Sequence, residues 1–230
     1  MRRSRLTQDR VRGAPRALRA RLLAGFLVAA LTGAAASGPV TAHDAPAPGR
    51  PASTPALSAA PALPAIKPAP DFVLRATTGE AVRLSELRGR IVLVSFIYTQ
   101  CTTACPLLTQ RLALLRSRLR RTPGAAGDVH FLSITVDPTR DSAAALQRYA
   151  RHFGAPARGW QFLRDEPERL APVLAAYDEW TRPEPSGDID HPARLYLIDR
   201  AGSIREIYSL SFFDERQAYL DIQALRREHR

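Results

Sequence analysis

One segment constrains the fold of this chain more than any other. Residues 91–98 read IVLVSFIY, a nearly continuous run of β-branched and aromatic residues that is typical of a strand buried on both faces. Leucines then recur at helical spacing in residues 107–121, and residues 129–136 (VHFLSITV) form a second run of the buried type. A strand, a helix and a strand in this order predict a βαβ unit with two parallel strands inside a covered sheet.

The chain after residue 70 extends this unit. We predict a hairpin from residues 72–74 and 81–84, helices at 141–153, 167–177 and 214–228, strands at 194–198 and 203–208, and an irregular stretch at 181–190. A βαβ half followed by a ββα half is the thioredoxin-like layout. The predicted fold class is therefore α/β, a thioredoxin-like fold with a central mixed sheet flanked by helices and an N-terminal hairpin at the sheet edge.

The first 70 residues predict no folded domain. Residues 1–42 combine an Arg-rich start, an uncharged run at 22–36 and the small residues 40–42, which is the layout of a signal peptide or, if uncleaved, of an N-terminal membrane anchor. Residues 43–70 are rich in Pro and Ala without periodicity and predict an extended linker. We therefore expect residues 71–230 to form one domain that is exported to the periplasm, either free or anchored to the inner membrane.

The net charge is less informative than it first suggests. The chain has 33 basic and 22 acidic residues, a formal charge of +11, and such an excess is common in proteins that bind nucleic acid or acidic membranes. Residues 1–42, however, contain eight arginines and one acidic residue, so they carry +7 of this charge. We expect no nucleic-acid partner, membrane contact only through the N-terminal segment, and a monomeric domain.

The two cysteines of the chain, Cys101 and Cys105, lie in the segment TQCTTACP between the first buried strand and its helix. The start of a helix favours negative charge, which shifts a thiol toward thiolate. A structural disulfide would stabilise the chain little, because the loop it closes has only about five residues. Two functional hypotheses remain: a redox pair, which usually has two residues between its cysteines rather than three, or two ligands of a metal.

A metal site of this kind needs a further ligand. His191 ends the irregular stretch and directly precedes a strand, where thioredoxin-like folds bring a loop against the cysteine-bearing helix. The other four histidines are more easily explained as surface, core or terminal residues. Two thiolates and an imidazole form a soft three-coordinate site that suits copper, as Cu(I) or Cu(II), whereas zinc would want a fourth ligand.

Three segments resemble the Sco/SenC copper chaperones. They are FIYTQCTTACP at 96–106, SITVDPTRDS at 133–142 and DHPARLYLID at 190–199, and the resemblance covers most of residues 71–228. It implies that Cys101, Cys105 and His191 are the copper ligands and that Asp137 is an acidic residue near them. Two departures are Thr102, where the family often has Pro, and Pro192 directly after the histidine.

The resemblance also implies a function. The protein would deliver copper to the binuclear copper site of cytochrome c oxidase, or reduce the cysteines of that site, with the oxidase's copper-binding subunit or another copper protein as partner. On this interpretation the protein is a metallochaperone rather than an enzyme. The alternative is a periplasmic thiol-disulfide oxidoreductase or thiol peroxidase that uses Cys101 as nucleophile and Cys105 as resolving residue.

Overall fold

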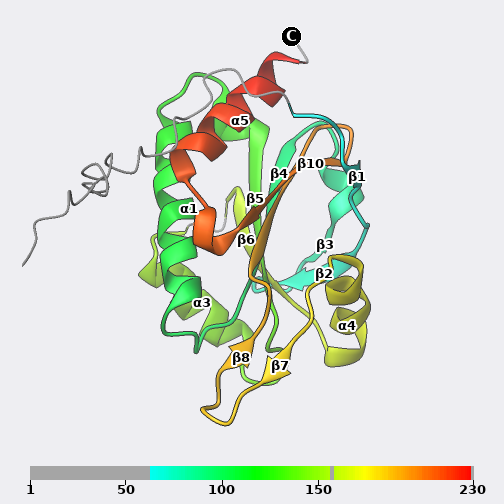
Figure 1. Cartoon of the computed structure of the whole chain (residues 1–230), viewed down its shortest axis with the longest axis vertical. Coiled ribbons are helices and arrows are strands. Elements are labelled where there is room, and N and C mark those ends of the chain that lie inside the picture. The colour runs from blue at the N-terminus through cyan, green and yellow to red at the C-terminus, as the bar shows by residue number, and fades with distance from the viewer. Residues whose placement is uncertain (1–62, 156–157, 229–230) are drawn as a thin grey trace, which may run out of the picture. The chain divides into compact units, whose positions relative to one another are not determined.

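The computed structural model describes residues 63–155 and 158–228. An eight-stranded mixed sheet forms the centre of this part of the chain, with the strands in the order β1-β10-β9-β4-β5-β6-β2-β3 (Figure 1). The strands are β1 (Lys67–Pro68), β2 (Val73–Ala76), β3 (Ala81–Arg83), β4 (Ile91–Ile97), β5 (Val129–Thr135), β6 (Trp160–Arg164), β9 (Arg194–Ile198) and β10 (Ser203–Ser209). A separate two-stranded ladder pairs β7 (Arg182–Pro183) with β8 (Ile189–Asp190).

The two middle strands, β4 and β5, form the core of the sheet. They run parallel in the register Ile91↔Val129, and every residue of both strands is buried. Two polar side chains in these apolar strands bond to each other, since Ser95 Oγ lies 2.9 Å from Ser133 Oγ. Ser133 Oγ also accepts a hydrogen bond of 3.0 Å from the indole of Trp160 on β6. The hydroxyl groups of Ser95 and Ser133 therefore bond within the sheet instead of remaining without partners.

Helices cover both faces of the sheet. They are α1 (Ala104–Arg120), α2 (Ala125–Asp128), α3 (Ala143–His152), α4 (Pro167–Ala176) and α5 (Glu215–Arg227), with short 3-10 turns at Leu84–Leu87 and Leu210–Phe212. Figure 1 shows α1, α3 and α5 on one side of the sheet and α4 on the other. Helix α1 buries Leu108, Leu112, Leu115 and Leu119, a spacing that places one apolar stripe against the sheet.

The predicted fold class is confirmed in its main features. The sheet is mixed, β4 and β5 are parallel neighbours, and the hairpin of β2 and β3 lies at one edge of the sheet. Strand β6 was not predicted, because its five residues, WQFLR, show neither a continuous apolar run nor a regular alternation. The short ladder of β7 and β8 lies inside the stretch predicted to be irregular.

The predicted boundary between the linker and the domain is wrong by several residues. Within the predicted linker of residues 43–70, Lys67 and Pro68 pair with β10 at the other sheet edge, and Leu63 is buried. The sequence analysis missed this strand because it contains Pro and lacks alternation, whereas an edge strand tolerates Pro on its unpaired side. The folded domain therefore begins before residue 71.

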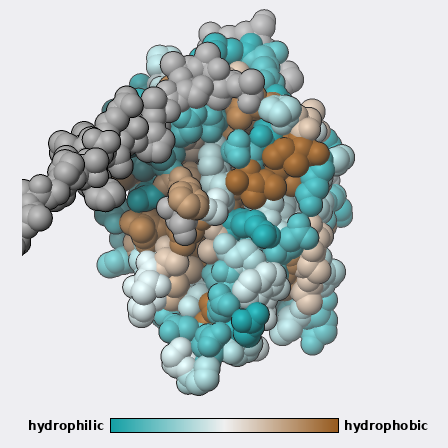
Figure 2. Space-filling model, in the orientation of Figure 1, coloured by the Kyte–Doolittle hydropathy of each residue, from teal (hydrophilic) through white to brown (hydrophobic). Residues whose placement is uncertain are grey.

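The surface that faces the viewer in Figure 2 is mostly hydrophilic, and its apolar areas are separate patches. Five large apolar side chains of the described residues are exposed, namely Ile66, Leu107, Leu114, Trp180 and Phe212. None of the helices in the described part of the chain combines the length and the apolar character that a membrane span requires. The signal peptide or anchor predicted at residues 1–42 lies outside the described residues.

Candidate metal centre

Cys101 and Cys105 lie together at the start of α1. Strand β4 ends at Ile97 and α1 begins at Ala104, so Cys101 lies in the connecting loop and Cys105 in the first turn of the helix. The backbone N–H of Cys105 donates to Cys101 Sγ over 3.3 Å. Both cysteines are free thiols and both are buried, Cys101 at 7% exposure and Cys105 at 1%. The predicted proximity of the two sulfur atoms is thus present in the fold.

The two thiols differ in acidity. The S–H of Cys105 and the backbone N–H groups of Cys105, Thr103 and Ala104 donate to Cys101, which lowers the pKa of Cys101 to about 4. The same hydrogen bond and burial raise the pKa of Cys105 far above that of an ordinary thiol. At neutral pH the pair therefore carries one thiolate, at Cys101, and one proton, on Cys105. A thiolate is the form that binds metals and attacks disulfides.

Asp141 anchors the loop that carries Cys101. This carboxylate is fully buried and accepts hydrogen bonds from the backbone N–H and the hydroxyl of Thr99 and from the hydroxyl of Thr135. Burial raises the pKa of Asp141, and its charge in turn disfavours ionisation of Cys105. Asp141, which the sequence analysis did not single out, is therefore an acidic residue that acts on the cysteine pair.

Asp137, the predicted acidic residue, contacts the loops of the site through Arg140. Its carboxylate pairs with Arg140 Nε and accepts from the hydroxyl of Thr139. Arg140 Nη1 in turn donates to the side chain of Gln100 over 3.4 Å and to the carbonyl of Gly187 over 2.6 Å. Arg140 thus joins the loop before Cys101 to the loop before His191, and Asp137 holds Arg140 in place.

His191 lies in the connection between β8 and β9, against a buried carboxylate. Its Nδ1 is 3.3 Å from Glu179 Oε2 and 3.2 Å from the backbone N–H of Ala193. The Glu179 side chain is 0% exposed, and its other oxygen accepts from the backbone N–H of Arg194 over 3.1 Å. A carboxylate at one ring nitrogen orients a histidine so that its other nitrogen is available to a metal.

Tyr98 contacts both the cysteine pair and the histidine. Its ring packs edge-on against the ring of His191, with centroids 5.9 Å apart. Its hydroxyl accepts from the backbone N–H of Ile189 over 3.2 Å and interacts with Cys101. Burial and the neighbouring Cys101 raise the pKa of Tyr98 to about 12, so the hydroxyl keeps its proton. Tyr98 therefore connects the thiolate to the loop that carries His191.

The structure brings the predicted ligands to one region without closing a site around them. Cys101 and Cys105 are in contact, and His191 packs against Tyr98, which also contacts Cys101. Within residues 63–155 and 158–228, no three Cys, His, Asp or Glu side chains are grouped closely enough to hold a metal ion. The donor types nevertheless suit a soft metal, because one sulfur is ionised and the imidazole is oriented by a carboxylate.

Sequence reasoning missed Tyr98, Glu179 and Arg140 in this region, in addition to Asp141. Tyr98 was assigned to a buried strand, and its position three residues before Cys101 was the available signal. Glu179 and Arg140 carry no comparable signal, because their roles depend on contacts with His191 and with two separate loops.

Known proteins match this chain over most of its described length. A model of the SCO1/SenC family matches residues 62–226. The SCO1 protein homolog of Bacillus subtilis is 28% identical over 143 residues, which cover 60% of this chain and 72% of that protein. The mitochondrial SCO2 homolog of Bos taurus is 32% identical over 144 residues, and the match spans 60% of this chain but only 53% of the bovine protein.

A solved structure agrees with these matches. ScoI of Bradyrhizobium japonicum, solved with copper bound, superposes with a TM-score of 0.57 at 29% identity, over 67% of this chain and 97% of that one. Since the family match covers the whole described sheet and both cysteines, this thioredoxin-like protein belongs to the SCO1/SenC family.

Proposed function

We propose that this protein binds one copper ion through Cys101, Cys105 and His191 and delivers it to the binuclear copper site of cytochrome c oxidase. Sco family proteins are involved in copper binding and in the assembly of cytochrome c oxidase. The observation that carries the proposal is the pair of free, adjacent sulfur atoms at the start of α1, one of which is held as a thiolate. Copper is the cargo, and the protein supplies the ligands.

The acidity of the pair supports uptake of copper near neutral pH. The Cys101 thiolate needs no deprotonation before it binds, whereas the Cys105 thiol must release its proton when the second sulfur joins. The proposal therefore predicts that loading of copper releases about one proton from the thiol pair. Since metal and protons compete for the same sulfur atoms, copper affinity falls as the pH is lowered.

The third ligand requires a rearrangement. Since no three potential ligands among the described residues are grouped closely enough to hold a metal ion, we propose that the histidine loop, which contacts Tyr98, shifts so that the imidazole meets the sulfur atoms. We propose that Cu(I) can bind to the two sulfurs before this shift and that Cu(II) needs the imidazole as well. The contact between His191 and Glu179 then keeps the ring oriented toward the metal.

The same pair of sulfurs can also reduce the cysteines of the client. In that reaction the Cys101 thiolate and the Cys105 thiol form a disulfide and lose two electrons and one proton, and the client disulfide takes up both to become one thiol and one thiolate, which then takes a proton from water. The unequal acidity of the two thiols favours this exchange, because one thiolate attacks while the second thiol resolves the mixed disulfide.

Copper titration of the reduced full-length chain tests the proposal. The wild type should bind one Cu(I) per chain under anaerobic conditions, and the double variant Cys101→Ser, Cys105→Ser should lose stoichiometric binding. His191→Ala should weaken Cu(II) more than Cu(I), while His152→Ala, at an exposed histidine, serves as the matched control. If the double variant still bound one copper ion tightly, the proposal would be wrong. Turnover of insulin disulfides or of peroxide without stoichiometric copper would support the oxidoreductase alternative instead.

We also propose that residues 1–42 direct export, which would place the domain beside the oxidase on the outer side of the membrane. N-terminal sequencing of the exported protein distinguishes a cleaved signal peptide from a retained anchor, and retention of the full-length protein in the cytoplasm would contradict export.

A further inference from the structure

A cavity of about 560 Å³ lies at the end of the sheet opposite to the cysteines. Arg90 directly precedes β4, Arg116 and Arg120 lie in the last turns of α1, and Arg158 precedes β6. Strand β4 separates this end from the cysteine loop by about 20 Å, since seven strand residues rise about 3.3 Å each. The cavity is therefore distinct from the candidate copper site.

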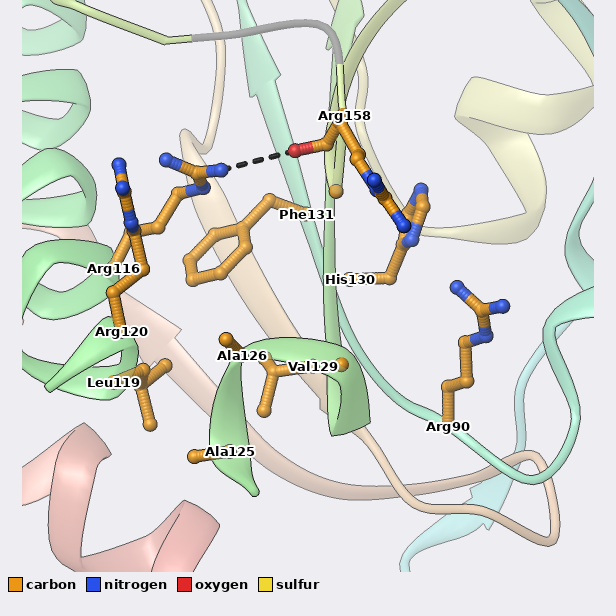
Figure 3. Close-up of a pocket in the computed structure, with 12 residues that line it drawn as sticks. Arg90, Arg116, Leu119, Arg120, Ala125, Ala126, Val129, His130, Phe131 and Arg158 are labelled. Carbon is orange, nitrogen blue, oxygen red and sulfur yellow. Dashed lines mark hydrogen bonds between the residues drawn. The ribbon is translucent and has the colours of Figure 1, made fainter. Parts of the chain in front are cut away.

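Arginines from three separate parts of the chain line this cavity. Figure 3 shows Arg116 and Arg120 on the α1 side of Phe131, with Arg158 and Arg90 on the other side of this ring. Arg116 donates to the backbone carbonyl of Arg158 over 2.9 Å. Burial and the neighbouring charge of Arg120 lower the pKa of Arg116. The fold therefore places positive charges close together, and their mutual repulsion opposes folding.

Carboxylates do not compensate these charges in the part of the chain that the structure describes. None of the four guanidinium groups forms an ion pair with a described residue, and the residues that line the cavity include no Asp or Glu. Asp128, next to the cavity in sequence, pairs with Arg200 and Arg226 instead. Glu80 accepts a hydrogen bond from Gln161 and acts on His130, but it forms no ion pair with any of the four described arginines. The positive charge is therefore available to an external anion.

His130 adds a further polar group to the same wall. It is 8% exposed, its Nε2 lies 2.7 Å from Gln161 Oε1, and its Nδ1 has no hydrogen-bond partner among the described residues.

The carboxyl end of α1 alone does not explain the cluster of arginines. A helix C-terminus favours the cations Arg116 and Arg120, but Arg90 and Arg158 belong to other elements.

We propose that this cavity binds an anion that carries two linked phosphate groups. Guanidinium groups bind phosphate oxygens with paired hydrogen bonds, and several of them can engage both groups of a diphosphate at once. A volume of about 560 Å³ falls within the range of small-molecule sites and has room for more than a single inorganic ion. The same chemistry is offered by a soluble diphosphate and by the two phosphates of a cardiolipin headgroup.

Calorimetric titration of the metal-free, full-length protein with inorganic pyrophosphate tests the proposal. Wild type should bind it saturably, and the double variant Arg90→Gln, Arg120→Gln should bind it more weakly by at least about tenfold, because each lost guanidinium removes charge-assisted hydrogen bonds. Both residues are exposed, so the fold should tolerate the changes. The control Arg83→Gln, Arg216→Gln removes the same charge at two arginines that pair with carboxylates elsewhere.

A second arm separates the two sources of the ligand. Wild type and both double variants are mixed with sedimenting vesicles made of equal parts of phosphatidylcholine and cardiolipin. Weaker sedimentation of the Arg90→Gln, Arg120→Gln variant alone would support a lipid headgroup, whereas pyrophosphate binding with equal sedimentation of all three proteins would support a soluble ligand. If neither binding event depends on Arg90 and Arg120, or if the control double variant loses as much, the proposal is overturned.

Discussion

The ring of His191 packs edge-on against the ring of Tyr98, with centroids 5.9 Å apart and an interplanar angle of 72°. Tyr98 belongs to the loop of Cys101, since it directly follows β4, and its hydroxyl interacts with Cys101. Tyr98 therefore contacts both the thiolate of Cys101 and the imidazole of His191.

Tyr98→Phe should raise the pKa of Cys101 above its value of about 4. The substitution keeps the ring against His191 but removes the hydroxyl that stabilises the thiolate, and a shift of about one unit corresponds to one hydrogen bond to a charged group. Titration of the thiolate by its ultraviolet absorbance measures this shift. Tyr219→Phe, whose hydroxyl contacts Thr122 elsewhere, is the control and should leave the titration unchanged. A Cys101 pKa identical in wild type and Tyr98→Phe would contradict the role of the hydroxyl.

The acidity of Cys101 should make the stability of the reduced protein depend on pH. Its pKa is about 4 in the fold against 9.0 for an ordinary thiol, so between these values the unfolded chain binds more protons and stability rises with pH. Above pH 9 the trend reverses, because Cys105 keeps its proton in the fold while the unfolded chain releases it.

Urea unfolding of reduced wild type and Cys101→Ala at several pH values checks this dependence. The difference in unfolding midpoint between the two proteins should widen from pH 4 toward pH 9 and become independent of pH below pH 4. A difference that stays constant over this range would show that Cys101 titrates alike in both states.

Glu179→Gln should weaken Cu(II) binding by about 10- to 100-fold, which is the usual effect of losing the carboxylate behind a ligating histidine. The amide oxygen of the new Gln side chain can still accept the hydrogen bond from the backbone N–H of Arg194. The substitution should therefore change the orientation of the His191 ring more than the stability of the fold. Cu(II) titration followed by the sulfur-to-copper absorption measures the affinity. Glu184→Gln, at an exposed position in the same segment, is the matched control, and an equal affinity of both variants would argue against this role of Glu179.

Arg140→Ala should loosen the loop before His191. The substitution removes the hydrogen bonds to Gln100 and Gly187 and leaves the buried carboxylate of Asp137 without its ion pair, a loss of about 1–3 kcal/mol. Faster amide hydrogen exchange in residues 186–190 and a lower melting temperature should follow. Arg148→Ala, at an exposed position on α3, is the comparison. Exchange rates in residues 186–190 that do not differ between the two variants would contradict the bridging role of Arg140.

The elements that were predicted correctly are those with a strong local pattern. Strand β4 and helix α1 have continuous or periodic apolar residues, and this pattern alone placed Cys101 and Cys105 at a junction between strand and helix. Strand β6 has no such pattern, and the sequence analysis missed it. Asp137 was expected near the cysteines; its carboxylate contacts Thr139 and Arg140, and the expectation stays a prediction.

The sequence by itself determined the order of the main elements, the helix start that favours a thiolate and the placement of both sulfur atoms, because these follow from residues close together in the chain. Only the tertiary structure decided which buried carboxylate faces His191, which ring contacts both His191 and Cys101, and which arginines gather at the opposite end of the sheet. The physical reason is that these contacts join residues of different elements. The order in which the strands pair sets the distances between residues of different elements. No local spacing in the chain encodes that order.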